Sequence, residues 1–436
     1  MEAVKITKSV YGDIVLPIIG QTKIWKYTMC NGFMSVEIMN YGATILAINV
    51  PNSDGTKENV ILGYDDIIGY LNMRNPYLGA TIGRYGHRIA GAAFVLRDQT
   101  YYLSKNKGYH TYHGGVQGFD KKVWSSRIEE MSVVMTYRSY DLEEGFPGDL
   151  CVSARFILTS QNQLIVVYKA IPSNITTPVN IMNQIYFNLS GDPTSNVMQH
   201  DLKVFSEYQA VLQEDEPIPT GETEELKDTI FEFKKYTTIA DIMSPKREST
   251  IGDEGGKVEE VNSIRTEKDV ASDERTQMSV SPCPYKGVYY CIEGLGVRSH
   301  AKLKHEQSGR SIQIFSDQPC LFLSFGQELL DAPASRGKWG TNAGILLQTG
   351  NFPDAVHHDK FPSPWIQPRK TYQHTIVYKF RVSKLDCSDE EDGEPKPKEV
   401  SEEEARMKCF TIKQENNDSA IPEDVKGGKR DAYRHL

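Results

Sequence analysis

The chain has 436 residues, of which 39% are hydrophobic, and a formal net charge of −9 at pH 7. This length and apolar content can form one large hydrophobic core or two modest ones. The acidic balance argues against nucleic acid or a membrane surface as a partner, because both attract proteins through a basic face.

The N-terminus and the cysteines favour a reducing compartment. Charges, Gly12 and Pro17 interrupt the apolar residues at the N-terminus, so the basic-then-apolar order of a signal peptide is missing. No apolar run approaches the roughly 18 residues of a membrane helix. The seven cysteines are scattered without a CxxC pair, which disfavours zinc and disulfide frameworks. We expect a cytoplasmic or nuclear protein with no metal and no cofactor.

In chain order, short runs of β-branched and aromatic residues alternate with Gly, Asn, Asp and Pro, which is typical of strands and turns. One short helix is predicted at 65–71. Because no βαβ alternation occurs, the pattern predicts an all-β fold, a large antiparallel β-sandwich. The predicted strands include residues 35–39, 44–50, 164–168, 311–315, 321–325 and 375–380.

Two segments differ in composition from the rest. Residues 244–282 are charged and nearly free of aromatics, which predicts a disordered insertion. Residues 385–436 begin with an acidic run broken by prolines, which predicts a disordered acidic tail. Because strand patterns resume after the insertion, we interpret residues 1–384 as one domain that carries a long loop.

Six motifs occur in a fixed order along the predicted domain. They are GRYGHRIA at 83–90, HTYHGGVQGFD at 110–120, EGFPG at 144–148, NQIYFNLSG at 183–191, PIPTG at 217–221 and QTGNFPDA at 348–355. Together they resemble the galactose mutarotase (aldose 1-epimerase) family. The resemblance covers residues 1–383 apart from the insertion. It implies a galactose mutarotase-like β-sandwich with a sugar cleft, and interconversion of the α- and β-anomers of a hexose such as galactose.

The resemblance also assigns catalytic positions. Mutarotation needs a base for the C1 hydroxyl proton and an acid for the ring oxygen. The family uses a glutamate and a histidine, and here these positions hold Gln348 and Gln184. A glutamine donates and accepts hydrogen bonds but does not exchange a proton at pH 7. Since each lost acid or base typically costs about 10²–10⁴-fold in rate, the sequence predicts a catalytically impaired member.

Other positions bear on substrate binding. Arg88 and His113 match the family's arginine and second histidine, and His87 lies where an asparagine is usual. An arginine can bind sugar hydroxyls with its fork of donors, although both residues could equally hold loops in place. The family's sugar-binding aspartate falls nearest to residues 285–291, around Gly287, where no carboxylate occurs.

Several alternatives remain open. His87, His110 and His113 could form a rebuilt acid/base site or a three-histidine metal site, although ordinary loop histidines are the simpler interpretation. The pair His357 and His358 has the same simple interpretation.

The leading hypothesis is a pseudoenzyme that binds a carbohydrate or, through its tail, a protein partner. The alternative is an active aldose 1-epimerase with a rearranged site. A sugar-phosphate binder is a third candidate, but it would need a basic cluster at the cleft, and only Arg84 and Arg88 lie nearby in the sequence. The tail also contains acidic-directed kinase patterns at Ser388 and Ser401 and a SUMO-like pattern around Lys413.

Overall fold

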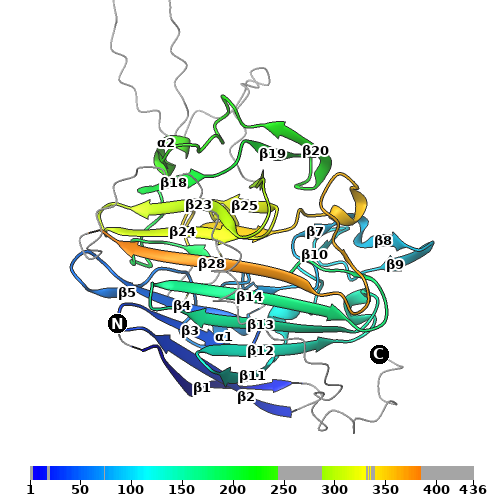
Figure 1. The fold of residues 1–436 in the computed structure, drawn as a ribbon, viewed down its shortest axis with the longest axis horizontal. Helices are drawn as coiled ribbons and strands as arrows, with labels where there is room; N and C mark the ends of the chain where they lie inside the picture. Colours follow the sequence, from blue (N-terminus) through cyan, green and yellow to red (C-terminus); the bar gives the residue numbers. More distant parts are fainter. Residues whose placement is uncertain are drawn as a thin grey trace, which may run out of the picture. The chain divides into compact units, whose positions relative to one another are not determined.

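A computed structural model describes residues 3–16, 20–72, 74–243, 287–329, 332, 334 and 339–383. Antiparallel sheets dominate it, as Figure 1 shows. The predicted insertion at 244–282 and the predicted tail at 385–436 lie outside the described residues. Among the described helices none has the length and apolarity needed to cross a bilayer.

The first layer is a nine-stranded sheet, whose strands from β11 to β18 follow one another across Figure 1. Every neighbouring pair in it is antiparallel. In spatial order the strands are β11 (Ser125–Glu129), β12 (Ser132–Ser139), β13 (Leu150–Leu158), β14 (Gln163–Pro172), β28 (Tyr372–Val382), β24 (Arg310–Ser316), β23 (Arg298–His305), β18 (His200–Val204) and β21 (Thr237–Thr238).

The second layer consists of a five-stranded and a six-stranded sheet. A β-bridge between Ile61 and Phe187 links the two. The five-stranded sheet is β1 (Lys5–Leu16), β2 (Gly20–Cys30), β3 (Ser35–Met39), β4 (Thr44–Pro51) and β5 (Lys57–Asn59). The six-stranded sheet is β17 (Tyr186–Phe187), β26 (Ile345–Gly350), β25 (Cys320–Ser324), β22 (Val288–Cys291), β19 (Tyr208–Leu212) and β20 (Pro219–Glu225).

Short elements connect the layers. The two-stranded ladders are β7 (Arg88–Ile89) with β10 (Thr111–Tyr112), β6 (Thr81–Ile82) with β16 (Met182–Asn183), β15 (Thr177–Pro178) with β27 (Trp365–Ile366), and β8 (Ala93–Leu96) with β9 (Gln99–Tyr102). The helices are α1 (Ile67–Leu71), α2 (Ile239–Met243) and the 3-10 turns η1 (Ala90–Ala92), η2 (Phe119–Lys121), η3 (Glu143–Gly145), η4 (Gln327–Leu329) and η5 (Ala355–His357). The Asp66 carboxylate caps α1 by accepting from the Ile68 and Gly69 amides, which confirms the predicted helix.

The core lies between the layers and follows from period-two alternation. In β14, Leu164, Val166 and Tyr168 point into the main apolar cluster. Leu323 of β25 and Leu347 of β26 join the same cluster from the opposite layer. The predicted antiparallel sandwich is therefore confirmed, and the predicted strands coincide with β3, β4, β14, β24, β25 and β28 to within a few residues.

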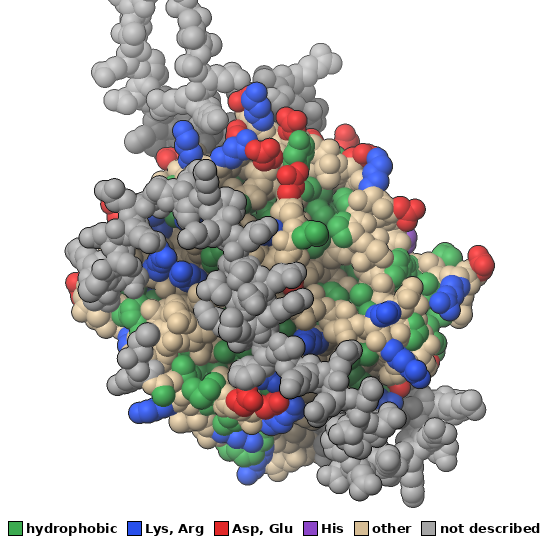
Figure 2. Space-filling view, viewed as in Figure 1, with side chains coloured by type: hydrophobic (Ala, Val, Ile, Leu, Met, Phe, Trp, Pro, Cys, Tyr) green, Lys and Arg blue, Asp and Glu red, His purple; other side chains and the backbone are tan. Residues whose placement is uncertain are grey.

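Charged side chains of both signs cover the face in Figure 2, where blue Lys and Arg side chains lie beside red Asp and Glu side chains. Such exposed pairs, for example Arg127 with Glu129 on β11, contribute roughly 0–1 kcal/mol each to stability. The polar contacts that stabilise the fold must therefore lie deeper.

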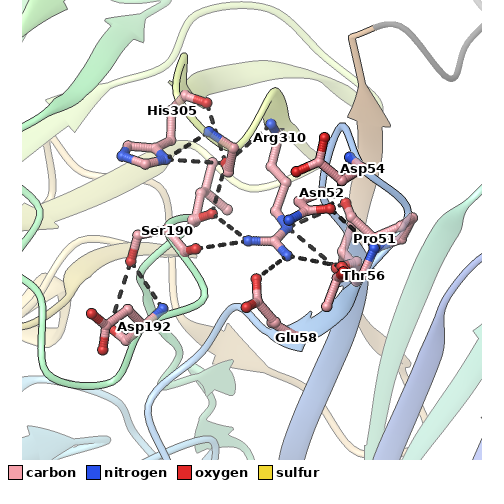
Figure 3. Close-up of polar contacts among 12 residues, drawn as sticks. Pro51, Asn52, Asp54, Thr56, Glu58, Ser190, Asp192, His305 and Arg310 are labelled. Atoms are coloured by element: carbon pink, nitrogen blue, oxygen red, sulfur yellow. Dashed lines mark hydrogen bonds and ion pairs between the residues drawn. The ribbon is translucent and has the colours of Figure 1, made fainter.

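Arg310 at the start of β24 is the clearest buried contact, with 1% of its surface exposed (Figure 3). Its guanidinium donates to the carbonyls of Pro51 and Ser190 and to a carboxylate oxygen of Glu58 at 2.6 Å. One side chain thus ties the first layer to the segment between β4 and β5 and to the loop after β17. Removing it would leave several buried carbonyls without donors.

We predict that Arg310→Met lowers the free energy of unfolding by roughly 3 kcal/mol or more, since the buried acceptors lose their donor. The matched Arg127→Met change on exposed β11 should cost at most about 0.5 kcal/mol. Chemical denaturation of the full chain measures both. Equal losses in the two variants would contradict the role given to Arg310.

Candidate functional site

The site is built on the face of the six-stranded sheet that points away from the main core. Register places Gln348 of β26 opposite Phe322 of β25, and Phe322 opposite Tyr289 of β22. The alternate residues Leu347 and Leu323 belong to the core cluster. Alternation along the strands therefore turns Gln348, Phe322 and Tyr289 to one side as a continuous row.

The His87 and His113 rings cover this row. The His87 ring lies 4.8 Å from the Phe322 ring and 5.1 Å from the Tyr289 ring, measured between centroids. The pairing of β7 with β10 brings the histidines together: the His87 amide donates to His113 Nδ1 at 3.1 Å, and the His113 amide donates to the His87 carbonyl. Both residues have left-handed backbone, with φ of 60° and 54°, a conformation that is often found at functional sites.

Gln348 and Gln184, which the sequence resemblance assigned to the catalytic positions, are hydrogen-bonded to each other. Gln348 Nε2 donates to Gln184 Oε1 at 2.6 Å and to the Asn183 carbonyl at 3.2 Å. Gln184 Nε2 donates to the Tyr186 hydroxyl, which donates to Glu328 Oε1 at 2.8 Å. We call the side chains of Gln348, Gln184, Tyr186 and Glu328 the amide relay. It begins with two side-chain amides and ends in a carboxylate.

These side chains are almost wholly buried: the exposed fractions are 1% for Gln348, 3% for Gln184, 3% for His87 and 0% for His113. Two of their polar atoms, His113 Nε2 and Gln348 Oε1, have no hydrogen-bond partner. Because His113 Nδ1 accepts a hydrogen bond, the neutral ring carries its proton on Nε2. One donor, His113 Nε2, and one acceptor, Gln348 Oε1, are thus without a partner. A hydroxyl group or a water molecule can both accept and donate, and so could satisfy them.

Burial also makes the histidines poor proton carriers. Desolvation, reinforced by the nearby Arg88 cation, lowers the pKa of His87 to about 3. Desolvation likewise holds the pKa of His113 well below its ordinary value, with smaller contributions from His87 and Arg88. Both rings are therefore neutral at pH 7 and have little capacity to act as acids.

The two arginines of the first motif have different environments. Arg88 is half-buried. Its guanidinium lies 5.0 Å from the centre of the Tyr112 ring and makes no hydrogen bond or ion pair with the described residues. Arg84 is 2% exposed and donates to the Gly148 and Pro147 carbonyls and the Ser139 hydroxyl. The donors of Arg84 are therefore already used inside the fold, which leaves Arg88 as the one nearby arginine of the motif with a free guanidinium among the described residues.

Gly287, the nearest position to the family's aspartate, lies against Phe322. Its φ is +72°, and an added Cβ would come within 2.3 Å of the Phe322 ring. A side chain is therefore excluded at this position, and the preceding residues 285 and 286 lie outside the described part. The aromatic ring of Phe322 fills this side of the site.

The remaining candidate histidines have partners outside this group. His110 Nδ1 accepts from the Gly91 amide, and Nε2 lies 2.8 Å from a Glu216 oxygen. His357 Nδ1 bonds to Asp354 at 2.6 Å, and this contact raises the pKa of His357. Among the described residues, no three His, Cys, Asp or Glu side chains are placed to bind a metal ion.

Sequence reasoning missed three residues of the site: Phe322, Tyr289 and Glu328. The first two are brought to Gln348 by strand register, which a single sequence does not reveal. Glu328 lies in η4, outside the six motifs. A weak signal did exist, since Gln348 interrupts an apolar strand and so marks a polar group that needs a buried partner.

Comparison with known proteins shows to which family the chain belongs. The family model described as Aldose 1-epimerase matches residues 26–379. The galactose mutarotase of Bos taurus is 32% identical over 386 residues, covering 87% of this chain and 100% of that protein. The galactose mutarotase of Homo sapiens is also 32% identical, covering 87% of this chain and 99% of that protein.

Solved structures agree on the fold. A galactose 1-epimerase from Lactobacillus acidophilus superposes with a TM-score of 0.67 at 21% identity, covering 87% of this chain and 99% of that chain. An aldose epimerase homologue from C. elegans superposes with a TM-score of 0.65 at 21% identity, covering 80% of this chain and 96% of that chain. The chain has a galactose mutarotase-like fold. It belongs to the aldose 1-epimerase family.

The contrast between the two arginines predicts opposite effects on stability. Arg84→Met should lower the free energy of unfolding by at least about 3 kcal/mol, because several buried acceptors lose their donor. Arg88→Met should cost at most about 1 kcal/mol, since it loses only the contact with the Tyr112 ring. Urea denaturation distinguishes them, and a large loss in Arg88→Met would show that Arg88 has a structural role.

The ion pair of His357 with Asp354 predicts a pH-dependent contribution to stability. Because the folded pKa of His357 is raised, its contribution is fully present below the ordinary value of about 6.5 and disappears as the pH rises through the folded value. His357→Gln should therefore be more destabilising at pH 5.5 than at pH 9, measured by denaturation at both pH values. A difference that grows toward high pH would contradict this assignment.

Proposed function

We propose that this member of the aldose 1-epimerase family is a pseudoenzyme that binds a free sugar without accelerating its mutarotation. The observation that carries the proposal is the 2.6 Å hydrogen bond between the Gln348 and Gln184 amides at the positions of the family's base and acid. An amide pair can position a hydroxyl but does not exchange protons near neutrality.

The polar atoms of the site that lack partners favour the binding of a ligand with several hydroxyl groups. His113 Nε2 and Gln348 Oε1 have no partners, and the Arg88 guanidinium is free of contacts with described polar groups. A donor, an acceptor and a cationic fork suit sugar hydroxyls, which both donate and accept. The buried ring of Tyr289 and the half-buried ring of Phe322 add an apolar surface of the kind on which sugar faces stack. Because His113 Nε2 and Gln348 Oε1 are buried, a ligand can reach them only if the Tyr289 and Phe322 rings move.

A second candidate is an active aldose 1-epimerase with a rearranged site. Glu328 favours it, because this exposed carboxylate is connected to Gln184 through the Tyr186 hydroxyl. The lowered pKa of His87 weighs against it, since a ring with a pKa of about 3 is a weak base and is already deprotonated at pH 7.

We also propose that the protein acts in the cytoplasm or nucleus and that its acidic tail can bind a protein partner. Composition supports this part of the proposal, through the reduced-thiol pattern and the charged, proline-containing tail sequence.

Anomer exchange of galactose and glucose, measured by NMR with the full chain, tests the proposed function. We predict that the wild type stays close to the spontaneous rate. Gln348→Glu combined with Gln184→His should exceed the wild-type rate by at least about tenfold, because a single positioned acid or base is worth about 10²–10⁴-fold. The double variant restores both proton-transfer groups at their family positions.

A matched control replaces two exposed glutamines, Gln99→Glu and Gln161→His, and should leave the rate unchanged. Strong acceleration by the wild type would overturn the pseudoenzyme proposal in favour of the rearranged site. If Glu328→Ala then abolished that acceleration, Glu328 would be identified as its proton carrier.

A further inference from the structure

Glu328 is a carboxylate of the site that lies outside the six sequence motifs. It lies on η4, is exposed, and its two oxygens accept from the Tyr186 and Ser324 hydroxyls at 2.8 and 2.7 Å. We propose that Glu328 is a positioning residue that fixes the direction of the amide relay, so that the site accepts only a ligand with a hydroxyl donor at the Gln348 position. This inference rests on the proposed sugar binding.

The direction of the relay follows from what a carboxylate can do. An ionised Glu328 only accepts, so the Tyr186 hydroxyl must donate to it. The Tyr186 oxygen is then free to accept from Gln184 Nε2, which turns Gln184 Oε1 toward Gln348. A single negative charge therefore orients two consecutive groups, the Tyr186 hydroxyl and the Gln184 amide.

The hydrogen bonds at the Gln348 end of the amide relay fix the same direction. Gln348 Nε2 donates both to Gln184 Oε1 and to the Asn183 backbone carbonyl, which also only accepts. Both partners require the amide nitrogen of Gln348, so its Oε1 must point elsewhere. That oxygen is the atom without a partner.

The orientation determines which ligand fits. A free Oε1 can accept a hydrogen bond but cannot donate one, so the group placed against it must be a donor. By the family resemblance this position faces the C1 hydroxyl of the sugar. A reducing hexose supplies a donor there, whereas a 1-deoxy hexose leaves the buried oxygen without a partner. Sites built to bind a hydroxyl discriminate strongly against an analogue that lacks it.

The Glu328 carboxylate is needed because the hydrogen bonds of the amide relay could otherwise run in the opposite direction. With a neutral amide at residue 328, a side chain that can donate would face Tyr186, and the Tyr186 hydroxyl could then donate to Gln184 Oε1 instead. Gln184 would turn its nitrogen toward Gln348, and only the Asn183 carbonyl would still hold the Gln348 amide. Glu328→Gln should therefore weaken the preference for a donor without removing the binding site.

The first measurement needs no ligand. In full-length protein labelled with 15N-glutamine, the Gln348 and Gln184 side-chain amides should exchange their protons slowly with water. Glu328→Gln and Tyr186→Phe should each speed this exchange roughly tenfold, because both remove the charge-assisted end of the relay. The exposed Glu129→Gln variant on β11 is the matched control. Unchanged exchange in Glu328→Gln would overturn the positioning role.

The second measurement compares the dissociation constants of galactose and its 1-deoxy analogue by NMR titration. The wild type should prefer galactose by at least about tenfold. Glu328→Gln should reduce the ratio to within about threefold, and Glu129→Gln should keep the wild-type ratio. Equal binding of both sugars by the wild type would refute the inference and leave the proposed function intact. If the wild type bound neither sugar, the proposed function and the selectivity would both be wrong.

Discussion

The candidate site depends on the burial of Arg84. Its guanidinium fixes the loop between β6 and β7 to the turn at residues 139–148 by donating to the Ser139 hydroxyl and the Gly148 carbonyl. Desolvation lowers the pKa of Arg84 to about 10, but the side chain remains charged at neutral pH. Because His87 and Arg88 follow only three and four residues after Arg84, the same anchor helps to determine where the His87 ring and the Arg88 guanidinium lie.

Burial also accounts for the neutrality of the site. A charge moved into a dry interior needs a partner, and breaking such a pair typically costs several kcal/mol. Arg84 and Arg310 meet this need with backbone carbonyls. At the centre of the site, two glutamines hydrogen-bond to each other without any charge. A carboxylate at residue 348 would stand in the same buried position, 1% exposed, with a neutral amide as its neighbour. The burial of residue 348 is therefore consistent with the absence of charge on the two glutamines.

Local sequence patterns and motifs predicted the fold and part of the candidate site. Residues 35–39 coincide with β3, because alternation of apolar and polar residues identifies a half-buried strand without knowledge of its neighbours. Gln348, Gln184, His87 and His113 were found through motifs. Phe322 and Tyr289 were not, because their contact with the motif residues is created by the register of β22, β25 and β26. The anchoring role of Arg84 was not predicted for a related reason: sequence alone does not show whether a cation faces solvent or backbone carbonyls.

The two glutamines act as one unit. Gln348 donates to Gln184, Gln184 donates to Tyr186, and each amide is oriented by its neighbours. A glutamate at residue 348 alone would present an acceptor to Gln184 Oε1, so Gln184 would have to turn and give up its bond to Tyr186. A histidine at residue 184 alone would supply one group that exchanges protons but would leave an amide, which does not, at residue 348. Because residues in one hydrogen-bond network are energetically coupled, neither change has an effect independent of the other. The effect of a substitution at either glutamine therefore has to be measured together with the other.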